Sequence, residues 1–84
     1  MIKLVMEKHM ERYKNLGGGS SIIGYESGQD FIRVQFSDNS IYLYTYASTG
    51  SHYIEKMKHL ASDGQGLNSF IGTTVRKKFA RKES

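Results

Sequence analysis

Three tyrosines alternate with aliphatic and β-branched residues between Ile41 and Tyr46. Side chains along a strand alternate between its two faces. We therefore expect Tyr42, Tyr44 and Tyr46 to share one face of a strand. A row of phenol rings can stack on the bases of a nucleic acid, or it can pack beneath a helix with its hydroxyls at polar rims. The pattern itself leaves both interpretations open.

A group of cations follows Val75. The net charge is +4, and residues 1–75 carry equal numbers of acidic and basic side chains, so the excess lies in Arg76, Lys77, Lys78, Arg81 and Lys82. Such a localised basic segment can attract phosphates or an acidic partner. A lysine-rich helix end that favours solubility and the helix dipole is the alternative.

Residues typical of catalytic and metal sites are poorly arranged for either purpose. His52, Glu55 and His59 share a predicted helix face, but the two histidines lie about 10.5 Å apart along the axis, too far to bind one ion. The serines have no recognisable base or oxyanion-hole partner in the sequence. We therefore expect no enzymatic activity, no metal and no cofactor.

A run of three glycines, Gly17-Gly18-Gly19, is followed by Ser20 and Ser21. A phosphate-binding loop would end in Gly-Lys-Ser/Thr and would follow a strand, whereas this run precedes one. We interpret residues 17–21 as a flexible connector.

The periodicity of apolar residues predicts an α+β fold, a three-stranded antiparallel meander sheet with one N-terminal helix and two C-terminal helices. The expected helices span residues 2–16, 51–62 and 67–79, and the expected strands span residues 22–26, 31–36 and 41–46. Residues 1–16 are expected to form a helical extension, residues 20–79 the main domain, and residues 80–84 a basic tail.

The turn between the second and third strands sets the predicted face of each side chain. A two-residue loop at Asp38 and Asn39 places Phe36 opposite Ile41 and Arg33 opposite Tyr44. One face of the hairpin is then an aliphatic core layer, and the other carries tyrosines beside one guanidinium.

Several short motifs resemble the KTSC domain, a small module of some lysyl-tRNA synthetases and of stand-alone bacterial and phage proteins. The likeness spans residues 20–79 and depends on Gly24-Tyr25, Phe36, Tyr42-Leu43-Tyr44, Ser62-x-Gly64, Asn68 and Val75-Arg76. The family usually has glycine in the hairpin turn, where this sequence has Asn39-Ser40. The resemblance implies an α+β module for which RNA binding has been suggested and no firm activity is established.

The length of 84 residues indicates one domain of modest stability, and the absence of cysteine excludes disulfides and thiolate metal sites. The apolar residues at the start of the sequence are interrupted by Glu7 and Lys8, too early for a signal peptide or a membrane span. We therefore expect a cytoplasmic protein that does not interact with membranes.

These observations favour a non-catalytic module that binds RNA. The predicted binding residues are Arg33, Tyr42, Tyr44, Asn68, Arg76, Lys77 and Lys78. One alternative is a homo-oligomer that sequesters a nucleotide or cyclic oligonucleotide between subunits, using Tyr42, Tyr44 and Arg33. A second is a protein-interaction module that docks through an exposed edge of the sheet.

Overall fold

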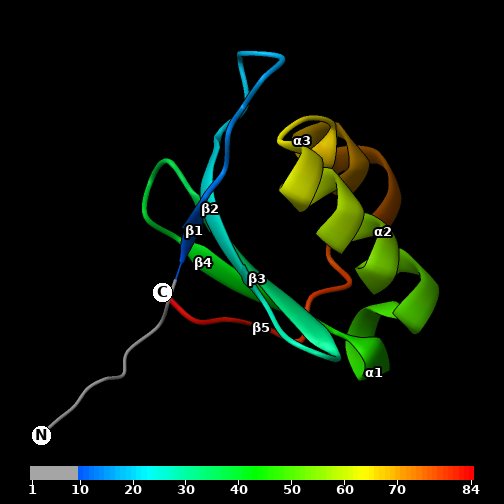
Figure 1. Cartoon of the computed structure of the whole chain (residues 1–84). Coiled ribbons are helices and arrows are strands. Elements are labelled where there is room, and N and C mark those ends of the chain that lie inside the picture. Colours follow the sequence, from blue (N-terminus) through cyan, green and yellow to red (C-terminus); the bar gives the residue numbers. More distant parts are fainter. Residues whose placement is uncertain (1–9) are drawn as a thin grey trace, which may run out of the picture.

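The computed structural model describes residues 10–84. Its strands are β1 (Glu11–Arg12), β2 (Ile22–Ser27), β3 (Phe31–Phe36), β4 (Ile41–Thr45) and β5 (Arg81–Lys82). Its α-helices are α1 (Tyr46–Thr49), α2 (Ser51–Asp63) and α3 (Leu67–Phe70), and a π-helical turn (Ile71–Val75) continues α3. Figure 1 shows that the helices cover one face of the sheet.

The sheet is antiparallel and its strands follow one another in the order β1-β2-β3-β4-β5. The α+β class and the three central strands are confirmed. The sheet has five strands instead of the predicted three because a two-residue strand is added at each edge. Both edge strands depend on pairing with a longer neighbour, since two residues cannot form a stable strand alone.

The predicted N-terminal helix is wrong for its described part. Glu11 and Arg12 pair with Tyr25 and Gly24 of β2. The next residue, Tyr13, is buried, and its hydroxyl accepts a hydrogen bond from the Leu67 amide at 3.3 Å. Tyr13 is therefore one of the apolar residues whose spacing suggested a helix, but it is buried from an extended segment. Residues 2–9 of the predicted helix lie outside the described residues.

The β3–β4 register is displaced by one residue from the predicted pairing. Arg33 lies opposite Leu43, and Ile32 lies opposite Tyr44. The turn contains three residues because Asn39 adopts a left-handed conformation with φ of 71° and its amide donates to the Phe36 carbonyl at 2.8 Å. A type I turn followed by a left-handed residue is a common three-residue hairpin loop. The predicted two-residue loop is therefore wrong.

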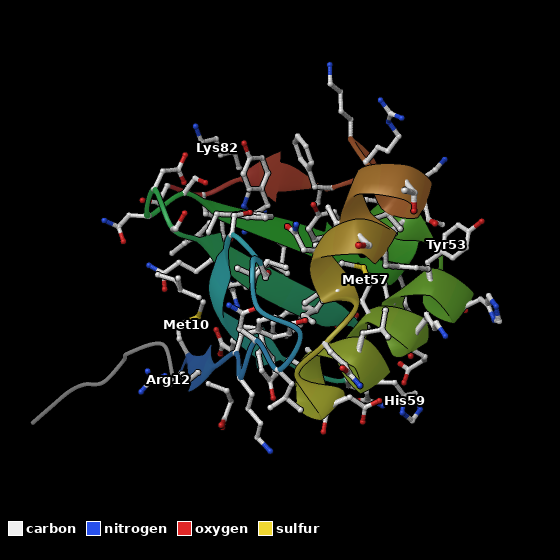
Figure 2. All side chains as sticks on the ribbon, turned by 90° about the horizontal axis from the view of Figure 1, so that it is seen from above. Met10, Arg12, Tyr53, Met57, His59 and Lys82 are labelled. Carbon is white, nitrogen blue, oxygen red and sulfur yellow. The ribbon has the colours of Figure 1, made fainter. Side chains whose placement is uncertain are left out.

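The hydrophobic core lies between the inner face of the sheet and the helices. Its most buried side chains include Ile32, Val34, Tyr44, Ile54, Met57 and Leu67. Figure 2 shows Met57 on the inner side of α2, whereas Tyr53 and His59 extend outward. The expected helix at residues 51–62 is confirmed as α2, whose buried side chains are Ile54, Met57 and Ala61, and Gly64 ends it in the left-handed region with φ of 81°.

The predicted helix at residues 67–79 ends four residues early. After Val75 the backbone leaves the helix at Arg76, whose φ is 43°. The predicted basic tail at residues 80–84 instead contributes β5, in which Lys82 pairs with Tyr42 and Arg81 with Leu43. This early ending places Arg76, Lys77 and Lys78 outside the helix and lets Arg81 and Lys82 pair at the edge of the sheet.

Candidate nucleic-acid interface

Arg33 lies on the outer face of the sheet, away from Tyr42 and Tyr44, because its neighbours in the ladder are Glu26 and Leu43. Its Nε donates to Glu83 Oε1 at 2.7 Å, and its Nη1 donates to Glu26 Oε1 at 3.2 Å. The guanidinium carbon is also 4.9 Å from the centroid of the Phe31 ring. The predicted surface that combines Arg33 with the tyrosines is therefore wrong.

These contacts shift the pKa values of Arg33 and Glu83. The hydrogen bond to Glu83 is the largest of the effects that raise the pKa of Arg33. Burial acts to raise the pKa of Glu83, but the hydrogen bond and charge of Arg33, aided by Arg81, outweigh it and lower the pKa below its ordinary value. Arg33 therefore links β2, β3 and the residue that follows β5, which is a structural role.

We expect Arg33→Ala to lower the free energy of unfolding by roughly 1–2 kcal/mol at neutral pH, because it leaves Glu26 unpaired and Glu83 with Arg81 as its remaining partner. A carboxyl group with a lowered pKa stabilises the fold above its unfolded pKa, and this contribution is lost as the pH falls through the folded pKa. The difference between the variant and the wild type should therefore shrink below pH 4.5, the ordinary pKa of Glu83.

Urea unfolding at neutral and acidic pH measures this difference. Arg12→Ala, which removes an exposed cation from β1, is the matched control and should leave the urea midpoint nearly unchanged. Equal midpoints for wild type and Arg33→Ala at neutral pH would contradict the structural role.

Of the two interpretations of the tyrosine row, packing beneath the helices applies to Tyr44, and Tyr46 does not continue the row. Tyr44 is only 1% exposed, and burial followed by the neighbouring Tyr42 phenol raises its pKa to about 12. Tyr46 begins α1 instead of continuing the strand, and its hydroxyl donates to Glu55 Oε2 at 2.5 Å. Tyr44 therefore belongs to the core, and Tyr46 fastens α1 to α2.

Tyr42 is the partly exposed tyrosine of β4, and two further rings lie against it. Its centroid is 4.8 Å from that of Phe79 and 5.7 Å from that of Phe36, both in edge-to-face arrangements. We call these three half-buried rings the aromatic edge. The Lys82 Nζ lies 5.9 Å from the Tyr42 centroid, within cation–π range.

Three exposed cations precede Phe79 in the chain. Arg76, Lys77 and Lys78, which we call the basic turn, connect the π-helical turn to the aromatic edge. Their backbone is held in place, since the Arg76 amide donates to Ile71 at 2.7 Å and the Lys78 carbonyl accepts from Thr49 Oγ1 at 2.9 Å. Figure 2 shows Lys82 on the side of the molecule away from Arg12 and His59. Cations and rings thus meet at the β5 side of the sheet.

Asn68 is not part of the aromatic edge, but it is hydrogen-bonded to a residue beside it. Its Oδ1 accepts a hydrogen bond from Ser21 Oγ at 3.1 Å, and Ser21 belongs to a hollow of about 340 Å³ beside the aromatic edge. Asn68 also lines a second hollow, of about 350 Å³, between the glycine run and the start of α3. The predicted connector is a turn between β1 and β2 that forms one wall of this second hollow.

The sequence-based selection was thus partly correct in its geometry. The structure places Tyr42 against Phe79, which follows the basic turn in the chain. Asn68 is hydrogen-bonded to Ser21, which lines the hollow beside Tyr42. Arg33 and Tyr44 are separated from this surface. Phe36, Phe79 and Lys82 were missed as candidates. Phe79 and Lys82 reach Tyr42 where β5 pairs with β4, and this two-residue strand is too short to be recognised from alternation. Phe36 was assigned to the aliphatic core layer because the predicted register was displaced by one residue.

Neither a metal cluster nor a membrane-spanning helix occurs among residues 10–84. No three histidine, cysteine or carboxylate residues of this range are grouped so that they could hold a metal ion. No helix within the described range has the length and apolar character needed to cross a bilayer.

Comparison with models of known protein families, with curated proteins and with solved structures gives no match. The resemblance to the KTSC domain therefore stays an interpretation of the sequence motifs.

Proposed function

We propose that the protein binds single-stranded RNA without catalysis, through the aromatic edge, the basic turn and Lys82. The observation that supports this most directly is the contact of a partly exposed tyrosine with both another ring and a cation: Tyr42 has Phe79 edge-to-face at 4.8 Å and Lys82 Nζ at 5.9 Å. Single-stranded nucleic acid requires flat side chains for its bases and cations for its phosphates, and both occur here on one edge.

The expected affinity follows from the number of cations. Four exposed cations, in Lys82 and the basic turn, can neutralise about four phosphates, which gives a salt slope of about −2.8 on a single strand. Stacking adds about 1–3 kcal/mol for each base that contacts a ring. This combination corresponds to a binder of moderate affinity whose electrostatic part is lost at high salt.

The KTSC resemblance agrees with this proposal, since RNA binding has been suggested for that family. Membership of the family and a cytoplasmic location are parts of the same proposal. The alternative of a shared pocket built from Tyr42, Tyr44 and Arg33 is disfavoured, because Tyr44 is buried and Arg33 lies on the opposite face. A fold-level likeness alone would not distinguish these functions.

The test is a titration of fluorescently labelled uridine oligomers of about eight nucleotides, a length suited to a small single-strand site. We expect affinity to fall about 50-fold between about 50 mM and about 200 mM salt. A duplex of the same length should bind more weakly, because its stacked bases cannot reach Tyr42. Absence of binding at low salt, or binding that salt does not weaken, would overturn the proposal.

Changing the basic turn to glutamine at all three positions should flatten the salt slope by about 2, because three phosphate contacts are lost. Glutamine keeps the aliphatic stem of each side chain and changes only the charge. The matched control replaces Arg12, Lys14 and Lys56 by glutamine, which removes the same charge from exposed positions outside the basic turn. Equal slopes for the two triple variants would show that overall charge, and not this surface, governs binding.

A further inference from the structure

A hollow of about 340 Å³ opens beside the aromatic edge, at the β3–β4 turn. Two of its walls are the rings of Phe36 and Tyr42, and its remaining residues are polar: Ser21, Ser37, Asp38 and Ser40. A flat ring with a polar rim suits such a site, since one face of the ring can contact an aromatic side chain while its edge meets hydrogen-bonding groups.

Three polar side chains of this hollow, those of Ser21, Asp38 and Ser40, are arranged to present acceptors. Ser40 Oγ donates to Asp38 Oδ1 at 2.6 Å, and the Ser40 amide donates to the same oxygen at 3.0 Å. The Ser21 hydroxyl donates to Asn68 Oδ1 at 3.1 Å. Each of these hydroxyl hydrogens is therefore used within the protein, and each hydroxyl oxygen presents lone pairs.

Asp38 is the strongest acceptor in the hollow. Its side chain is exposed, and the hydrogen bonds from Ser40 lower the pKa of Asp38 below 3.8, so the carboxylate is ionised at neutral pH. Both bonds from Ser40 use Oδ1. The second oxygen, Oδ2, carries the remaining capacity to accept a donor from a ligand.

Among the bases, guanine matches this arrangement best. Its Watson–Crick edge carries two adjacent donors, the N1–H and the N2 amino group, which can approach a carboxylate together. Adenine and cytosine each carry one amino donor beside a ring-nitrogen acceptor on this edge, and uracil has a single N–H between two carbonyl acceptors. An acceptor-rich rim would leave those acceptors unpaired, which is costly in a partly enclosed site.

We propose that this hollow is a base-binding site selective for guanine, in which Asp38 accepts hydrogen bonds from the base and Tyr42 contacts the ring. This inference rests on the proposed RNA binding and adds the base preference to it. Lys82 pairs with Tyr42 in the ladder, so a cation is available for a phosphate next to a base held in the hollow. The carboxylate thus meets donors of the base while the cations meet the phosphates.

The experiment compares uridine oligomers of about eight nucleotides that differ in one central base. We expect an oligomer with one guanine to bind about 5- to 100-fold more tightly than the all-uridine oligomer. Inosine, which lacks the 2-amino group, should bind with intermediate affinity, and adenine should bind no better than uridine. This series uses the unaltered protein and does not depend on the folding of a variant.

Asp38→Asn supplies the second readout. Asparagine retains an Oδ1 that can accept from Ser40, so the turn should be preserved, but it replaces Oδ2 by an amide donor. The variant should bind guanine-containing and all-uridine oligomers equally. Asp63→Asn makes the same change of charge at the end of α2, outside the hollow, and should keep the guanine preference.

The outcomes separate the two proposals. Salt-dependent binding with equal affinity for all four oligomers would overturn the guanine site and leave the proposed RNA binding in place. Guanine preference that persists in Asp38→Asn would also overturn the site. Absence of binding to every oligomer would overturn both.

Discussion

Replacing Tyr44 with alanine is expected to lower the free energy of unfolding by about 3–5 kcal/mol, as for other large aromatic residues in cores. Tyr44 is 1% exposed, and its ring lies edge-to-face with Phe79 at 6.1 Å. Its removal leaves a cavity between the sheet and the helices that the surrounding side chains can fill only in part. A domain of this length has a total stability of about 4–13 kcal/mol, so the loss removes a large fraction of it.

Thermal and urea unfolding, followed by circular dichroism, measure this loss. Tyr44→Phe keeps the ring and should retain most of the stability. Tyr42→Ala, which truncates the half-exposed neighbour on the same strand face, should cost clearly less. If the two alanine variants lost equal stability, the assignment of Tyr44 to the core and of Tyr42 to the surface would be contradicted.

The same Tyr42→Ala change is expected to weaken single-stranded RNA binding about 5- to 150-fold, because one stacked base is worth about 1–3 kcal/mol. The ring of Tyr42 is the central member of the aromatic edge, with Phe36 and Phe79 on its two sides. Tyr42→Phe should retain most of the affinity, since stacking depends on the ring face and not on the hydroxyl.

Tyr53→Ala is the matched control for this binding measurement. Tyr53 is also half-buried and packs edge-to-face with a phenylalanine, Phe70, at 5.9 Å, but it extends outward from α2. Anisotropy titrations should show a loss for Tyr42→Ala and no comparable loss for Tyr53→Ala. A similar loss for both variants would indicate a general effect on stability instead of a stacking surface.

The longer strands and helix α2 were predicted correctly because the spacing of their apolar residues shows which side chains are buried. The alternation in residues 31–36 and the stripe of Ile54, Met57 and Ala61 each mark a face that contacts the core. The edge strands gave no such signal. Two residues contain one alternation at most, and β1 and β5 form only because a longer strand offers its unpaired edge.

The error in register shows why the predicted site was only partly correct. Ser37-Asp38-Asn39 can form a two- or a three-residue loop, and the outcome depends on Asn39 entering the left-handed region. A shift of one residue moves every side chain of one strand relative to its partner. Arg33 was thereby predicted beside Tyr44, whereas it lies on the other face of the sheet.

The exposed part of the site was predicted from composition alone. Tyr42 and the basic turn were candidates because a tyrosine in an alternating strand and a run of cations can be recognised from the sequence without a structure. Their proximity was not predicted, since it depends on the chain leaving the helix at Arg76 and returning to pair with β4. Lys82 was considered part of a tail for the same reason.

The pairing of β5 with β4 also bears on the order in which the protein folds. Consecutive strands β1 to β4 can pair through short turns, but β5 reaches β4 only after residues 46–80 have closed into a loop. Closing a long loop lowers the conformational entropy of the chain before the contacts between the strands can compensate for this loss. Such pairings therefore form late in folding. An incompletely folded chain would carry Tyr42 without its neighbouring lysine, and the surface that we assign to RNA would arise only in the last step of folding.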